Sequence, residues 1–254
     1  MSMDDIVNRY LDQLGLLERY SIPLSADDKY PMLCDLVKKH LETFAFCTVN
    51  HMLHFHHSMN DNDDDDNDKH RDNDSWLTLD KMSACDLYER ICVRRTGGYC
   101  MEHNKLIHDI LQHLGYDVEP ILARVVNNNL EFAADTNMDA RPPLTHRITL
   151  VKMNNHHHHN NNNHNNSEEE CHYIVDCAFG SNKCPSMPIH APTNNNDNDV
   201  DEDDRKGEED DSGRLFRIKF LNSTKNKNDS YHMQCCHDTL TGGKYFTNYI
   251  FTIP

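Results

Sequence analysis

The sequence lacks long apolar runs, basic stripes and C-x-x-C cysteine pairs, and each absence excludes a class of protein. No run approaches the roughly 20 apolar residues of a membrane-spanning helix. The acidic, amphipathic start MSMDDIVNRYLDQL is unlike a signal peptide. A net charge of -17 without a basic stripe offers no surface for a phosphate backbone. Ten cysteines without C-x-x-C spacing are typical of free thiols in a reducing compartment. We therefore expect a cytoplasmic protein that binds neither membranes nor nucleic acids.

Polar tracts rich in Asn, Asp and His interrupt the chain at four places: 56–74, 127–139, 154–170 and 193–213. Such tracts bury too little apolar area to offset the entropy of ordering, so we expect disordered inserts. Most of the negative charge lies in these tracts and says little about an active site. The histidine run 156–159 lacks the fixed ligand spacing of a structural zinc site, so no metal is predicted.

One cysteine, Cys100, lies between a glycine pair and a predicted helix. Gly97 and Gly98 permit a tight turn and a close backbone approach. Apolar residues at helical spacing follow, with Gly115 as the stop signal: Leu106, Ile107, Ile110, Leu111 and Leu114. The pattern predicts a helix that begins at Cys100. Because the amide groups at a helix N-terminus carry partial positive charge, a thiol there is a better nucleophile than one in mid-helix.

Two apolar runs downstream predict a pair of β-strands, each with a chemical group at one end. His146 opens the first run, in which Ile148 and Leu150 share one face, and Asp176 closes the second before a turn at Gly180. The Asn/His tract between the runs is a loop, so they are predicted to form an antiparallel hairpin with His146 directly opposite Asp176. A carboxylate so placed fixes the tautomer of the imidazole, which can then keep a nearby thiol ionised.

Cys100, His146 and Asp176 each have a plainer interpretation as well. A cysteine can be a small buried hydrophobe, a strand histidine can be a satisfied core residue, and an aspartate can be a turn former. Their joint appearance in the order Cys, His, Asp, each at the edge of a regular element, favours a nucleophile, a base and an orienting carboxylate.

Three segments, GGYCMEHN, THRITLV and YIVDCAFG, resemble the active-site blocks of the arylamine N-acetyltransferases. The similarity extends over nearly all of the chain outside the polar tracts. The resemblance implies transfer of an acetyl group from acetyl-CoA, as co-substrate, to an arylamine or arylhydrazine through an acetyl-cysteine intermediate. It makes Cys100 the nucleophile, His146 the base and Asp176 the residue that orients the base.

The resemblance also implies three contacts with the substrates. Phe179 would line the acceptor pocket, and Thr145 and Tyr249 would lie near the acyl or CoA side, Thr145 as a substrate-binding residue and Tyr249 as a cofactor-binding residue.

The fold implied by the resemblance is α+β. Residues 1–115 would form an N-terminal helical bundle that carries the nucleophile, and residues 116–254 would form a small β-barrel domain. Together they would give a thiol-protease-like Cys-His-Asp core. Family members continue into a C-terminal α/β lid, whereas this sequence stops at Pro254, so the lid is expected to be largely missing.

Two other functions stay open at the level of sequence. The order Cys, His, Asp also occurs in transglutaminase-like enzymes and other thiol hydrolases, in which water can replace the amine as acceptor. The third possibility is a truncated relative without catalytic activity.

Overall fold

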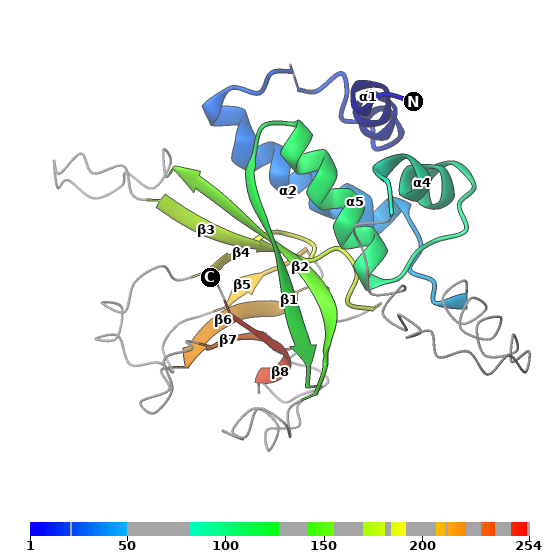
Figure 1. Ribbon diagram of the computed structural model, residues 1–254. Helices are drawn as coiled ribbons and strands as arrows, with labels where there is room; N and C mark the ends of the chain where they lie inside the picture. The colour runs from blue at the N-terminus through cyan, green and yellow to red at the C-terminus, as the bar shows by residue number, and fades with distance from the viewer. Residues whose placement is uncertain are drawn as a thin grey trace, which may run out of the picture.

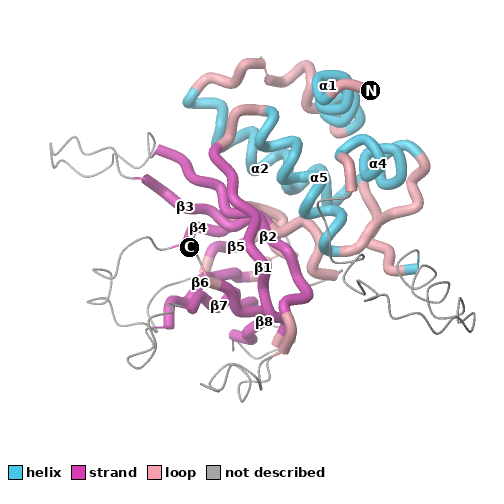
Figure 2. Tube along the Cα trace, viewed as in Figure 1, coloured by secondary structure: helices cyan, strands magenta, loops and turns pink. Residues whose placement is uncertain are grey.

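The computed structural model describes residues 1–20, 22–49, 82–126, 142–154, 170–180, 184–191, 207–211, 213–221, 230–236 and 245–252. The predicted inserts 56–74 and 127–139 lie outside these residues, as do 155–169 and 193–206. The helices gather on one side of a curved sheet, and α5 lies against β1 and β2 (Figure 1). Figure 2 shows the same division by secondary structure. The predicted α+β fold, helices followed by a barrel, is confirmed.

The helical part consists of α1 (Met3–Gln13), α2 (Ala26–Thr43), α4 (Ala84–Tyr88), the π-helical turn η2 (Glu89–Val93) and α5 (Cys100–His113). A serine caps the N-terminus of each of α1, α2 and α4. Ser2, Ser25 and Ser83 accept hydrogen bonds of 3.2, 3.2 and 3.1 Å from the backbone amide of the aspartate three residues later. A serine cap satisfies an otherwise unpaired amide, and an acidic first turn complements the helix dipole. Among the described residues, no helix is long and apolar enough to cross a membrane.

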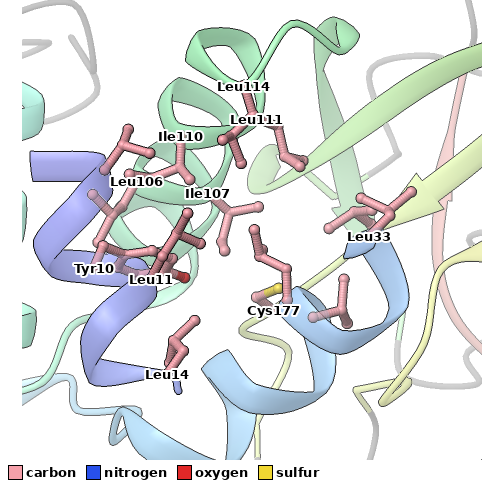
Figure 3. Packing of buried hydrophobic residues seen from close by; sticks show 14 of the residues in the cluster. Tyr10, Leu11, Leu14, Leu33, Leu106, Ile107, Ile110, Leu111, Leu114 and Cys177 are labelled. Atoms are coloured by element: carbon pink, nitrogen blue, oxygen red, sulfur yellow. The ribbon is translucent and has the colours of Figure 1, made fainter. Parts of the chain in front are cut away.

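The helices share one hydrophobic core. Leu11 from α1, Leu33 from α2 and Ile107 from α5 all lie in it, and each has no more than a trace of exposed surface (Figure 3). The same core continues into the sheet through Val151 and Val175. The helices are therefore attached to the sheet by apolar burial, which contributes about 25 cal/mol per Å².

The strands are β1 (Asp117–Val125), β2 (Leu144–Asn154), β3 (Glu170–Val175), β4 (Ile189–Ala191), β5 (Glu208–Glu209), β6 (Leu215–Leu221), β7 (Ser230–Cys236) and β8 (Tyr245–Phe251). They form one sheet in the order β4-β3-β2-β1-β8-β7-β6-β5, and all of its pairs are antiparallel. At the two edges, the His190 amide in β4 donates a 2.8 Å hydrogen bond to the Glu208 carboxylate in β5. The sheet thus curls into a nearly closed barrel.

Strand β2 is buried on both faces. Val151 points into the helical core, whereas Ile148 and Leu150 point into a second core inside the barrel. The prediction that Ile148 and Leu150 share a face is confirmed. Because successive side chains alternate between faces, one strand serves as the common wall of both cores.

The predicted hairpin is correct in topology but wrong in register. Strands β2 and β3 are antiparallel, and Thr149 pairs with Val175. Continuing this register brings His146 opposite Ala178 rather than Asp176, and Asp176 lies just beyond the end of β3. The two assignments differ by an even number of residues, so His146 and Asp176 keep the same face.

Two predicted inserts are shorter than expected. Asn154 and Glu170, the ends of one tract, are paired across β2 and β3. Residues 208–209, inside the tract 193–213, form β5 and pair with β6. Backbone pairing with a neighbouring strand does not require an apolar side chain, and composition therefore misjudged these positions.

Deletion of residues 155–166 tests the hairpin. It leaves 167–169 to connect the paired residues Asn154 and Glu170, and three residues suffice for a hairpin loop. We expect the free energy of unfolding in urea to stay within about 1 kcal/mol of the intact chain, because a shorter loop costs less closure entropy. A loss of more than about 3 kcal/mol would contradict this pairing.

Replacement of Gly97 by alanine tests the close approach beside Cys100. Gly97 has φ +74, and an added Cβ would lie 2.6 Å from the Ala45 oxygen and 2.8 Å from the Cys47 Cβ. We expect Gly97→Ala to lower the free energy of unfolding by about 2–4 kcal/mol, the sum of left-handed strain and overpacking. The matched control is Gly115→Ala, with φ +82 and no atom within 4 Å. Its loss should be only about 1–2 kcal/mol, and equal losses would show that Gly97 is not tightly packed.

Candidate active site

Cys100 is the first residue of α5, as the sequence predicted. The turn before it is pinned to the segment that follows α2, where Gly98 forms a parallel bridge with Phe46 and accepts a 2.8 Å hydrogen bond from the Cys47 amide. On the other side, the buried Glu102 carboxylate accepts a 3.1 Å hydrogen bond from the Tyr99 amide and pairs with Arg90. The first turn of α5 is thus held from both sides.

The structure brings Cys100, His146 and Asp176 together. The His146 Nε2 lies 2.8 Å from the Asp176 Oδ2, and both side chains are buried. The Cys100 thiol is partly exposed, and its Sγ lies 3.6 Å from the Thr145 carbonyl oxygen, beside His146 in β2. With Nε2 engaged by the carboxylate, Nδ1 is the ring nitrogen left for the thiol.

The electrostatics of the pair favour a charged imidazole. Burial alone would lower the pKa of His146, but the charge and hydrogen bond of Asp176, together with a hydrogen bond to Cys100, raise it to about 9. For Asp176, burial raises the pKa, yet the interaction with His146 and hydrogen bonds from Ala178 and Asn104 hold it below its ordinary value. At neutral pH the two side chains therefore form an imidazolium–carboxylate ion pair.

Asn104 is a site residue that the sequence analysis missed. This fully buried side chain donates to the Arg147 carbonyl at 2.6 Å and to the Asp176 Oδ1 at 3.1 Å, and it accepts from the Cys177 amide at 2.8 Å. It thereby joins α5 to β2 and to the loop that carries Asp176. The available signal was a polar residue one helical turn after Cys100 and three residues before Ile107, on the face that carries the apolar residues of the helix.

The aromatic residues named by the resemblance surround the imidazole. Phe179 and Tyr249 have ring centroids 4.8 and 5.0 Å from that of His146. Thr145 is exposed, and its carbonyl faces the thiol. Tyr249 has no exposed surface, so a direct contact with CoA does not fit this placement. Its contacts make it a packing partner of His146 inside the barrel.

A cavity of about 800 Å³ is lined by the residues that directly follow Asp176 in the chain. Its walls come from the end of α2 and the loop after it, including Phe44 and Phe46, and from the loop after β3, including Cys177 and Phe179. Lys38 and Arg214 also line it. Because Phe179 lines the cavity and contacts His146, it separates the imidazole from the cavity.

The other predictions about site chemistry concern cysteine and metal. No disulfide joins the ten cysteines, all of which the structure describes. Within the described part of the chain, no three His, Cys, Asp or Glu side chains lie together as metal ligands. The histidine run 156–159 lies outside that part.

Known proteins match both the sequence and the fold. A family model described as an N-acetyltransferase matches residues 78–253. An arylamine N-acetyltransferase of Mycobacterium bovis is 27% identical over 183 residues, which are 72% of this chain and 50% of that protein. A solved arylamine N-acetyltransferase from Mycobacterium marinum has a TM-score of 0.58 at 22% identity, covering 98% of this chain and 66% of that one. For a second structure of the M. marinum enzyme, in complex with CoA, these values are 0.51, 20%, 98% and 66%.

The match to these curated relatives covers 72% of this chain and 50% of each relative. The chain therefore spans about half the length of these relatives. The family match nevertheless includes Cys100, His146 and Asp176 and covers the whole barrel. Sequence and fold therefore agree, and the chain belongs to the arylamine N-acetyltransferase family.

Proposed function

We propose that the protein transfers an acetyl group from acetyl-CoA to an arylamine or arylhydrazine, with Cys100 as the nucleophile. The observation that carries the proposal is the buried His146 imidazole, which has the Asp176 carboxylate at 2.8 Å and the Cys100 thiol as a further hydrogen-bond partner. An imidazole held in this way can take the proton of the thiol and keep it, because the carboxylate stabilises the imidazolium.

In the first half-reaction, the Cys100 thiolate attacks the carbonyl carbon of the acetyl thioester. The amide groups of Cys100 and Met101, which precede the first backbone hydrogen bond of α5 at Glu102, can stabilise the oxyanion. The bond between the acetyl carbon and the CoA sulfur then breaks, and CoA leaves as a thiol with the proton from His146. The product is acetyl-Cys100, with His146 now neutral.

In the second half-reaction, the nitrogen of the acceptor attacks acetyl-Cys100. A bond forms between that nitrogen and the acetyl carbon, and the bond from the acetyl carbon to Sγ breaks. The proton lost by the amine passes to His146, which restores the thiolate and imidazolium pair. Asp176 is not protonated in either step and acts by orienting and stabilising the imidazole.

The cavity supports an aromatic acceptor. Phe44, Phe46 and Phe179 give it three aromatic wall residues, and aromatic pairs gain about 0.5–1.5 kcal/mol beyond apolar burial. We propose that the amine enters along Phe179 and that Thr145, whose carbonyl lies beside the thiol, borders the acetyl group.

Replacement of the nucleophile tests the proposal directly. We expect intact-protein mass spectrometry to show one added acetyl group after exposure of the wild-type chain to acetyl-CoA, and its loss after addition of an arylamine. Cys100→Ala should form no adduct. The matched control is Cys92→Ala, a buried cysteine whose thiol pKa burial raises to about 12, and it should acetylate normally.

Three results would contradict the transferase proposal. An adduct that maps to another cysteine would remove Cys100 from its role. An adduct on Cys100 that water removes as fast as the amine does would favour a thiol hydrolase, and the absence of any adduct would favour an inactive relative.

The raised pKa of His146 predicts a pH dependence of stability. Its folded value of about 9 lies above the ordinary 6.5, so the stabilisation is complete below about pH 6.5 and is lost as the pH rises to about 9. At about 1.4 kcal/mol for each pH unit, the loss is roughly 3 kcal/mol. We expect the difference in free energy of unfolding between wild type and His146→Gln to fall by this amount in urea titrations. Parallel pH curves for the two proteins would show that the ion pair is absent.

A further inference from the structure

A chain of buried hydrogen bonds runs through the helical core away from the triad. The Tyr10 hydroxyl lies 2.7 Å from the His40 Nδ1, the His40 Nε2 lies 2.7 Å from the His103 Nδ1, and the His103 Nε2 lies 3.1 Å from the Ala45 carbonyl oxygen. All three side chains are essentially without exposed surface. This hydrogen-bond chain links α1, α2 and α5 to the segment that follows α2, and the acetyl-transfer steps above do not use it.

The direction of every bond in this chain is determined by its last member. A carbonyl oxygen only accepts, so the His103 Nε2 donates to Ala45. Both imidazoles are neutral because burial lowers the pKa of His40 well below its usual range and that of His103 to about 4. The His103 Nδ1 therefore accepts from the His40 Nε2, and the His40 Nδ1 accepts from the Tyr10 hydroxyl. Each group has one role, and none can be reversed without leaving a buried donor or acceptor unpaired.

The Ala45 carbonyl at the end of this hydrogen-bond chain belongs to a residue that lines the cavity. It also accepts a 3.3 Å hydrogen bond from the Gly98 amide, two residues before Cys100. The next residue, Phe46, bridges to Gly98, lines the cavity and is 46% exposed. The position of this oxygen thus sets how the Ala45–Phe46 wall of the cavity stands relative to the thiol.

We infer that Tyr10, His40 and His103 are positioning residues that hold the Ala45–Phe46 wall and so govern access of an aromatic group to the Cys100 thiol. The inference rests on the proposed function only in that Cys100 is the reactive thiol; it does not require acetyl transfer. The three side chains act on the cavity wall through the Ala45 carbonyl, because none of them lines the cavity itself.

A pair of alkylating reagents separates this role from simple structural support. Iodoacetamide and 2-iodo-N-phenylacetamide share the reacting carbon and the leaving group and differ by a phenyl ring. In each case the bond between carbon and iodine breaks as the bond between carbon and Sγ forms. We define the aromatic ratio as the rate constant for Cys100 with the phenyl reagent divided by that with iodoacetamide. A lower folded fraction changes both rate constants by the same factor and leaves the aromatic ratio unchanged. A displaced Ala45–Phe46 wall changes the aromatic ratio.

The decisive comparison uses two tyrosine variants. Tyr10→Phe removes the donor to His40 and retains the ring that stacks on Phe44 with centroids 5.7 Å apart. We expect it to change the aromatic ratio at least about fivefold, a shift of about 1 kcal/mol at RT of 0.59 kcal/mol. Tyr88→Phe is the matched control, since Tyr88 is equally buried in the same core and its hydroxyl bonds to Gln13 instead. Its ratio should stay within twofold of wild type.

Variants of His103 give a second test. His103→Leu removes both hydrogen bonds and should change the aromatic ratio at least as much as Tyr10→Phe. His103→Gln has an amide that can accept from His40 and donate to Ala45, so it should restore the ratio to within about twofold. If His103→Leu does not fold, the comparison of Tyr10→Phe with Tyr88→Phe decides.

The outcomes distinguish this inference from the proposed function. A wild-type chain in which Cys100 does not alkylate faster than the other cysteines would overturn both. A reactive Cys100 with the same aromatic ratio in wild type, Tyr10→Phe and Tyr88→Phe would overturn the positioning role alone.

Discussion

A carboxylate without any exposed surface, that of Asp176, is the constraint on which the site depends. An unpaired buried charge costs several kcal/mol, so its partners must be delivered accurately. His146 comes from β2, Asn104 comes from α5, and the Ala178 amide comes from the loop that carries Asp176 itself. Satisfying this one group therefore requires the helix, the strand and the loop to occupy a single relative position, and that position also brings Cys100 to His146.

Polar side chains next to the nucleophile connect helix α5 to the barrel and to the segment that follows α2. Cys100, His103 and Asn104 lie three and four residues apart and so project from neighbouring positions of one turn. Asn104 reaches the barrel, and His103 reaches the segment that follows α2. Because a helix is rigid, the position of the thiol is coupled both to the barrel and to the segment that follows α2. A site built on regular elements holds its geometry more closely than one built on loops.

The local parts of the site were predictable because short-range chemistry decides them. A glycine pair before an apolar helical pattern placed Cys100 at a helix start, and alternating apolar runs placed His146 and Asp176 at strand ends. The errors concern non-local geometry. Register depends on which side chains fill the two cores around β2, and β5 forms from acidic residues because a neighbouring strand offers backbone partners. Neither the burial of Tyr249 nor the contacts of Asn104 can be read from spacing, since their partners come from distant parts of the chain.

The sequence by itself determined which residue types were available and in which order: a thiol at a helix start, then an imidazole and a carboxylate at strand edges, within a family that shares these blocks. Propensity, capping and alternation act over a few residues, and they leave the same signature in any context. Tertiary structure alone decided the charge state of His146, the tautomers of His40 and His103, and the distance from Asp176 to its partners. These properties follow from desolvation and from hydrogen bonds between side chains far apart in the chain, and they exist only once the helices have closed on the barrel.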